Sequence, residues 1–127
     1  MIKPENILDK WLLAVNKHDI DTLLALYHKS AILMPTFSNR LLNNPNKIRE
    51  YFEKLTRQEE LSVALHEKTL NIQAIENEIY VLCGIYYWRF SLDGELIRFE
   101  ARFSYILDLS QISPIIHHHS SQIPRML

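Results

Sequence analysis

Three consecutive histidines followed by two serines, at residues 117–121, are the densest group of reactive side chains in the sequence. Successive side chains of a β-strand point to opposite faces, so a strand here would divide this run in two. One face would carry His117, His119 and Ser121. The opposite face would carry Ile116, His118 and Ser120. The run therefore predicts a histidine pair on one face and a histidine beside a hydroxyl on the other.

Two histidines at positions i and i+2 of a strand can bind a metal ion, and His117 and His119 form such a pair. A catalytic zinc ion needs a third protein ligand. His66 and His28 are candidates, but no spacing selects either of them. Neutral histidines in a sheet also act simply as hydrogen-bonding partners. A zinc site and a structural role are both open for this pair.

Hydroxyl groups occur in two earlier segments. Thr36 and Ser38 follow a proline at the end of an apolar run, which places them at a pocket mouth or in a turn. Tyr51 falls on the apolar stripe of a predicted helix, where its hydroxyl either meets a partner or its ring only packs. These three side chains are candidates for binding a small polar ligand.

Arg102 and Ser104 alternate with apolar residues in a predicted strand. An arginine in the middle of a strand inside a cavity is suited to receive an anion. On an outer surface, Arg102 would pair with Glu100 instead. Both interpretations are open for Arg102.

The elements that position these residues follow from hydrophobic periodicity. Helical spacing predicts helices over 7–15, over a segment capped by Asp19 or Asp21 that carries residues 23–27, and over 47–57. A short strand is expected at 31–37, followed by strands at 61–74, 79–92, 96–109 and 115–121. Asp93-Gly94 is the strongest hairpin signal. Helices followed by a meander of four strands predict an α+β fold, with helices on one face of an antiparallel sheet.

Composition limits the classes of function. The chain has 127 residues, which suits one domain at 1–127, and its net charge of -1 argues against a nucleic-acid partner. No stretch is apolar enough for a secretory signal or a membrane span, so no membrane partner is expected. The single cysteine, Cys83, is expected to be an inert core thiol in a reducing, cytoplasmic setting.

The predicted order resembles the cone-shaped fold of nuclear transport factor 2, the ketosteroid isomerases and the polyketide cyclases. Within that superfamily, Trp11, Leu26-Tyr27, Tyr51-Phe52 and the long final strands look most like the association domain of calcium/calmodulin-dependent protein kinase II. The closing pattern His-His-His-Ser-Ser-x-x-Pro over 117–124 is more specific and resembles the iota-class carbonic anhydrases. Less specific segments of the same resemblance lie at 35–39, 48–52 and 101–105.

The carbonic anhydrase resemblance implies a metal-free homodimer whose pocket takes CO2 or bicarbonate. It implies catalytic roles for Thr36, Tyr51 and Ser120, and we predict that His118 moves the proton, because an imidazole titrates near neutrality. The predicted substrate-binding residues are Ser38, Arg102, Ser104 and Ser121. The chain departs from the family pattern at Ile123, where methionine is usual, and in the tail 125–127, which is not acidic.

Three alternatives accompany this hypothesis. A zinc or manganese hydrolyase would use His117 and His119. A binding or association module would assemble without turnover. A polyketide-cyclase-like enzyme would need a carboxylate base in the pocket, and no acidic residue is singled out for that role.

Overall fold

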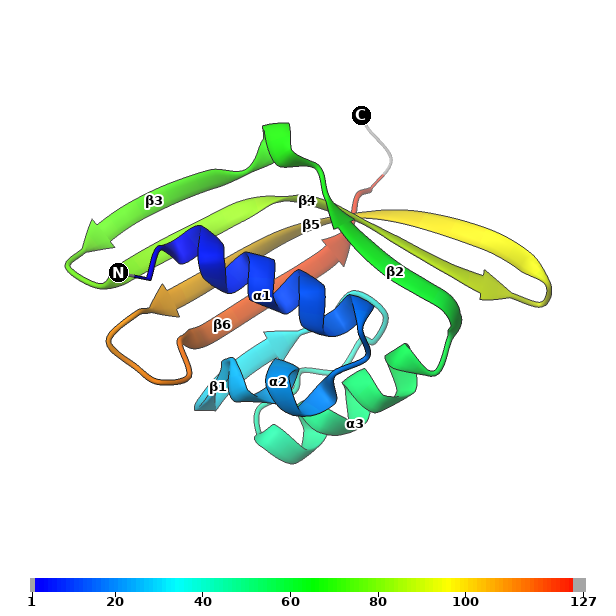
Figure 1. The fold of residues 1–127 in the computed structure, drawn as a ribbon, viewed down its shortest axis with the longest axis horizontal. Coiled ribbons are helices and arrows are strands. Elements are labelled where there is room, and N and C mark those ends of the chain that lie inside the picture. The colour runs from blue at the N-terminus through cyan, green and yellow to red at the C-terminus, as the bar shows by residue number, and fades with distance from the viewer. Residues whose placement is uncertain (1, 125–127) are drawn as a thin grey trace.

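Three helices lie against one face of a six-stranded sheet in the computed structural model, which describes residues 2–124 (Figure 1). The helices are α1 (Pro4–Asn16), α2 (Ile20–Ala25) and α3 (Pro45–Thr56). The strands are β1 (Tyr27–Met34), β2 (Glu59–Leu65), β3 (Asn71–Glu76), β4 (Ile79–Leu92), β5 (Glu95–Asp108) and β6 (Ile115–Gln122). The predicted α+β class is confirmed, and the tail 125–127 lies outside the described residues.

Local signals place the helix ends. Asp19 caps α2 by accepting a hydrogen bond from the Thr22 backbone, and Asn44 caps α3 in the same way through the backbone of Lys47. The second helix is shorter than predicted, because Tyr27 already belongs to β1. No helix within residues 2–124 is both long and apolar enough to cross a membrane.

The sheet is not the simple meander expected from the sequence. Its order is β1-β6-β5-β4-β2, with β3 also paired to β4. The segment 61–74, predicted as one strand, is two strands that lie end to end along β4, with a short 3-10 helix, η1 (Glu67–Thr69), between them. The first and last strands, β1 and β6, pair in parallel, so the sheet is antiparallel everywhere except at this edge.

Gly84 allows η1 to pass close to the middle of β4. A Cβ atom at this position would lie 3.1 Å from the Thr69 hydroxyl and 3.2 Å from the Phe103 ring. In its absence, the Thr69 hydroxyl accepts a hydrogen bond of 2.8 Å from the Ile85 backbone. The other glycine, Gly94, and Asp93 both have positive φ in the β4–β5 turn, as the predicted hairpin requires.

A bulge in β6 decides which of its side chains face the helices. Ile106 pairs with His117 whereas the next residue, Leu107, pairs with Ile115, so Ile116 is an extra residue in the ladder. The buried side of β6 therefore carries Ile115, His118 and Ser120. The prediction that Ile116 shares a face with His118 was wrong because the bulge interrupts the alternation.

The end of α1 is fastened to the sheet by Asn16. Its side-chain amide donates to the Val63 carbonyl, and its side-chain oxygen accepts from the Val63 backbone N–H, both at 2.8 Å. This pair of hydrogen bonds fixes how α1 crosses β2 above the core.

We expect Asn16→Ala to lower the free energy of unfolding by about 1–3 kcal/mol, because two backbone groups of β2 lose their partner. Lys17→Ala, one residue away on the same exposed turn, is the matched control and should change stability little. Urea unfolding followed by tryptophan fluorescence measures both variants. Equal stability of Asn16→Ala and Lys17→Ala would contradict the anchoring role.

Candidate active site

The centre of the core holds one buried imidazole among aromatic rings. His118 is 1 % exposed, and the Tyr105 ring stacks on it with 3.9 Å between ring centroids. Trp11 from α1 meets the same imidazole edge-on at 5.4 Å. Three elements, α1, β5 and β6, therefore hold the orientation of this side chain.

Hydrogen bonds give the imidazole a defined tautomer. The Trp11 indole N–H donates to the Tyr27 hydroxyl at 2.9 Å, and that hydroxyl lies 2.8 Å from Nδ1 of His118. An indole nitrogen can only donate, so the Tyr27 proton is available for Nδ1. The proton of the neutral ring then lies on Nε2, which is 3.2 Å from the Tyr86 hydroxyl. The hydrogen bonds run in one direction, from Trp11 toward Tyr86.

Burial keeps every member of this chain uncharged. Desolvation lowers the pKa of His118 well below its usual value, and the neighbouring His117 and His119 lower it further. Desolvation also raises the pKa of Tyr27 and Tyr86 above their usual values. The expectation that His118 titrates near neutrality was therefore wrong, and this imidazole is a neutral donor and acceptor.

Next to Tyr86, where these hydrogen bonds end, lies a surface pocket, here called the hydroxyl pocket. The Thr36 and Ser120 hydroxyls hydrogen bond to each other in its wall, and both interact with the Tyr86 hydroxyl and oppose the rise in its pKa. The pocket has a volume of about 340 Å³. Its lining residues are Met34, Pro35, Thr36, Ser38, Asn39, Arg40, Leu41, His119, Ser120, Ser121 and Gln122.

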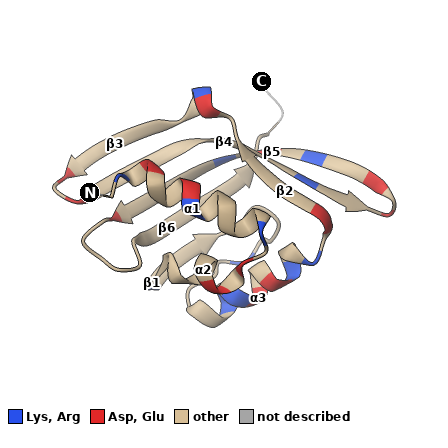
Figure 2. Ribbon diagram, viewed as in Figure 1, with Lys and Arg blue, Asp and Glu red and all other residues tan. Residues whose placement is uncertain are grey.

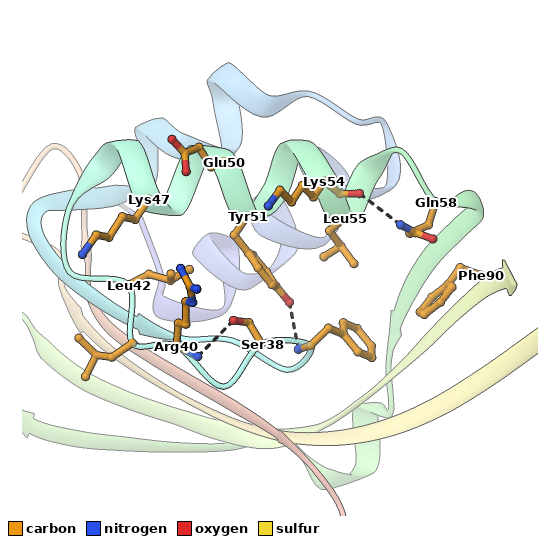
Figure 3. Close-up of a pocket in the computed structure, with 12 residues that line it drawn as sticks. Ser38, Arg40, Leu42, Lys47, Glu50, Tyr51, Lys54, Leu55, Gln58 and Phe90 are labelled. Atoms are coloured by element: carbon orange, nitrogen blue, oxygen red, sulfur yellow. Dashed lines mark hydrogen bonds between the residues drawn. The ribbon is translucent and has the colours of Figure 1, made fainter.

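Tyr51 contacts the loop that carries Thr36 and has no hydrogen bond to this pair of hydroxyls in the described residues. Its hydroxyl accepts a hydrogen bond of 3.2 Å from the Phe37 backbone, and its ring lines a second pocket between that loop and α3 (Figure 3). Desolvation raises the pKa of Tyr51. The structure thus brings Thr36 and Ser120 together, whereas Tyr51 holds the residue next to Thr36 from the other side. Ser38 lines both pockets.

Other predicted substrate-binding residues lie on the outer face of the sheet, away from the helices. In the ladder, Arg102 stands opposite Ser121, and Ser104 stands opposite His119. Arg102 is exposed there and faces away from the buried His118 and Ser120. The predicted site is therefore divided into two groups of residues. The alternation of side chains along the strands places Arg102 and Ser104 on the face of Ser121 rather than on the face of Ser120. Ser121 also borders the hydroxyl pocket.

The outer face has a shallow cavity of about 460 Å³ that includes Arg102, Ser104, His119 and Cys83 in its lining. Cys83 is half-buried there, so the prediction of a core thiol was wrong. The alternation of β4 explains this, since Leu82 is the buried neighbour.

The predicted metal ligands do not complete a site in residues 2–124. His117 is half-buried and His119 is exposed on the outer face. Of the third-ligand candidates, His66 is engaged with the Tyr87 hydroxyl at 3.0 Å, and Nδ1 of His28 accepts from the Ser30 backbone. Within this range no three His, Cys, Asp or Glu side chains are grouped for a metal ion.

Tyr86 and Tyr27 are site residues that the sequence analysis did not assign. Tyr86 was part of an aromatic-rich strand, and its buried companions Leu82, Trp88 and Phe90 repeat at even positions. That alternation marks Tyr86 as facing the same side as His118. The alternation does not indicate the hydrogen-bonding partners of the Tyr86 hydroxyl, because they lie on other strands.

A comparison with protein families assigns nearly the whole chain to one family. The sequence model of the calcium/calmodulin dependent protein kinase II association domain matches residues 5–124. A search of functionally described proteins finds no match.

Solved structures share the fold at low sequence identity. A Xanthomonas campestris protein, described as a candidate calcium/calmodulin dependent protein kinase II association domain, is 22% identical with a TM-score of 0.85, over 96% of this chain and 86% of that one. A candidate dehydratase of the NTF2-like family from Streptomyces avermitilis is 9% identical with a TM-score of 0.78, over 95% and 94%. A ketosteroid isomerase-like protein from Erwinia carotovora atroseptica is 12% identical with a TM-score of 0.75, over 95% and 94%. The fold is thus NTF2-like, and proteins of different described activities share it.

The buried neutral His118 predicts a stability that falls on mild acidification. The unfolded chain takes up a proton on this side chain below about pH 6.5, whereas the folded chain does not. The unfolded state then binds more protons, so the free energy of unfolding should fall between about pH 6.5 and pH 5, by at most about 1.4 kcal/mol per pH unit. Urea unfolding at a series of pH values measures this slope.

His118→Gln should be less stable at pH 7.5 and should lose this part of the slope. The control is His18→Asn, in the exposed α1–α2 turn, where asparagine tolerates the positive φ. An unchanged slope in His118→Gln would show that the imidazole is not held neutral.

Proposed function

The chain belongs to the calcium/calmodulin dependent protein kinase II association domain family, and we propose that this member is an enzyme that reversibly hydrates CO2 to bicarbonate without a metal ion. The observation that carries the proposal is the hydrogen-bonded pair Thr36–Ser120 at the wall of a pocket, backed by a one-way chain of buried donors. The His-His-His-Ser-Ser-x-x-Pro resemblance over 117–124 supports the same reaction.

The chain of hydrogen bonds supplies a donor to the pocket. His118 donates from Nε2 to the Tyr86 hydroxyl, which leaves the Tyr86 proton for Thr36 or Ser120. One of these two hydroxyls donates to the other, and the last proton of the series is free to point at a ligand. Such a donor suits the oxygen of CO2 that becomes negative as water attacks its carbon. Thr36 and Ser120 are the proposed catalytic residues, with Tyr86 and His118 positioning them.

The reaction balances with water as the nucleophile. A water oxygen forms a bond to the carbon of CO2, one C=O electron pair moves to an oxygen held by Thr36 or Ser120, and one water proton leaves. The pocket lining contains no carboxylate within the described residues. We infer that this proton passes to solvent or buffer at the open side, while the positively charged Arg40 of the lining favours the bicarbonate product.

Tyr51 has an indirect place in this mechanism. Its hydroxyl binds the backbone of Phe37 and so fixes the loop that carries Thr36. We propose it as a positioning residue rather than one that touches bicarbonate.

An association module without turnover is the second candidate, and membership of the association-domain family favours it. We propose a homodimer in either case, and a reducing cytoplasm as the setting of the unpaired Cys83. The mixed distribution of both charge signs over the described ribbon fits a small-molecule ligand better than a nucleic acid (Figure 2). The zinc alternative rests on His117 and His119 alone.

Ser120→Ala and Tyr86→Phe should each lower kcat/KM for CO2 hydration at least about tenfold, because each removes a donor from the series that ends at the substrate. Stopped-flow hydration with a pH indicator measures this on untagged protein. The matched controls are Ser62→Ala and Tyr80→Phe, which remove hydroxyls outside the hydroxyl pocket.

The same assay in the presence of a strong chelator separates the alternatives. Undiminished activity is expected for the metal-free reaction, whereas loss that zinc restores would move the site to His117 and His119. Absence of hydration in the wild type would overturn the enzyme proposal and favour the association module. Full activity of Ser120→Ala would overturn the assignment of the pocket.

The described lining of the hydroxyl pocket has no carboxylate, and its one imidazole, His119, lies on the outer face of the sheet, so we predict a strong dependence on buffer. At a fixed pH near 7, turnover should rise with the concentration of an imidazole buffer, which accepts the water proton. Stopped-flow measurements at constant ionic strength test this. A rate independent of buffer concentration would indicate a proton acceptor inside the protein.

A further inference from the structure

A second cavity of the described chain is larger than the hydroxyl pocket. It lies between α3 and the loop 37–42 and has a volume of about 560 Å³, within the usual range for small-molecule sites. We call it the α3 pocket. Bicarbonate is far smaller than this volume, so the proposed reaction does not account for it.

The two ends of the α3 pocket differ in chemistry. Figure 3 shows Arg40 and Lys47 toward one end and Phe90 at the other, with Lys54 between them on α3, beside Tyr51 and Leu55. Glu50 is the single acidic side chain of the lining, and it projects away from the loop. The lining thus combines three cations with one anion.

The cations of this pocket have no anionic partner in the described residues. The ion pair found in residues 2–124 joins Arg49 to Asp21, and neither of these lines the cavity. The Lys47 ammonium group donates to the side-chain oxygen of Asn43, at 3.4 Å. A negatively charged ligand would therefore meet positive charge without displacing an existing salt bridge.

The apolar end is built from aromatic rings that are already in place. Phe37 packs edge-on against Phe90 at 5.5 Å between centroids. The loop itself is held by the Tyr51 hydroxyl on the Phe37 backbone and by the paired backbones of Leu33 and Leu42. A ligand would therefore enter a formed cavity with an aromatic wall, at little cost in ordering the protein.

We propose that the α3 pocket binds an amphipathic organic anion, an aromatic body carrying one carboxylate or sulfonate group. The aromatic body lies against Phe37 and Phe90, and the acidic group lies among Lys54, Lys47 and Arg40. This binding site adjoins the hydroxyl pocket, with which it shares Ser38, Arg40 and Leu41, and it does not depend on CO2 hydration.

Two dyes with matched rings test the proposal on the full chain. 8-Anilinonaphthalene-1-sulfonate carries the anion, and N-phenyl-1-naphthylamine has the same rings without it. We expect saturable binding of one equivalent of the sulfonate, measured by fluorescence and calorimetry. Lys54→Met should weaken its binding about three- to fivefold, as expected for one exposed charge pair, and Lys54→Glu should weaken it more.

The uncharged dye should bind wild type and Lys54→Met equally, since the aromatic wall is unchanged. Lys29→Met removes an exposed lysine of β1 that does not line the pocket, and its affinity for the sulfonate should equal that of wild type. Absence of sulfonate binding, or equal binding by wild type and Lys54→Glu, would overturn the proposal. CO2 hydration by the same variants is read separately, so either proposal fails without the other.

Discussion

The neutrality of His118 is the constraint on which the rest of the interior depends. An imidazole surrounded by aromatic rings cannot carry charge, so each of its nitrogens needs a partner of fixed polarity. Tyr27 and Tyr86 supply those partners from β1 and β4, and Trp11 sets the polarity from α1. One hydrogen-bonded series therefore joins α1, the parallel strands β1 and β6, and β4 in the middle of the sheet.

The same series explains why the hydroxyl pocket lies where it does. At the far end of the series, Thr36 and Ser120 hydrogen bond to each other and oppose the rise in the pKa of Tyr86. Both hydroxyls sit at the boundary between the core and a pocket. The buried series thus affects the pocket only by orienting hydrogen-bonding groups, because none of its members is charged.

Much of the architecture could be predicted because each helix and long strand has its own local signal. Asp19 and Asp93-Gly94 mark ends that the structure confirms. The sequence could not reveal the bulge at Ile116, since a bulge depends on the partner strand. It also could not show that Arg102 faces outward or that Tyr86 joins His118, because those facts depend on pairings between segments far apart in the chain.

The parallel pairing of β1 with β6 has a consequence for how the chain is made. A ribosome releases residues 27–34 long before residues 115–122, so β1 lacks its neighbour until β6 has been made. Until then Trp11 and Tyr27 lack the imidazole that completes their hydrogen bonds. Contacts of such wide sequence separation slow folding, because a long loop must close before they form. The aromatic interior is therefore completed only after β6 has emerged, rather than helix by helix.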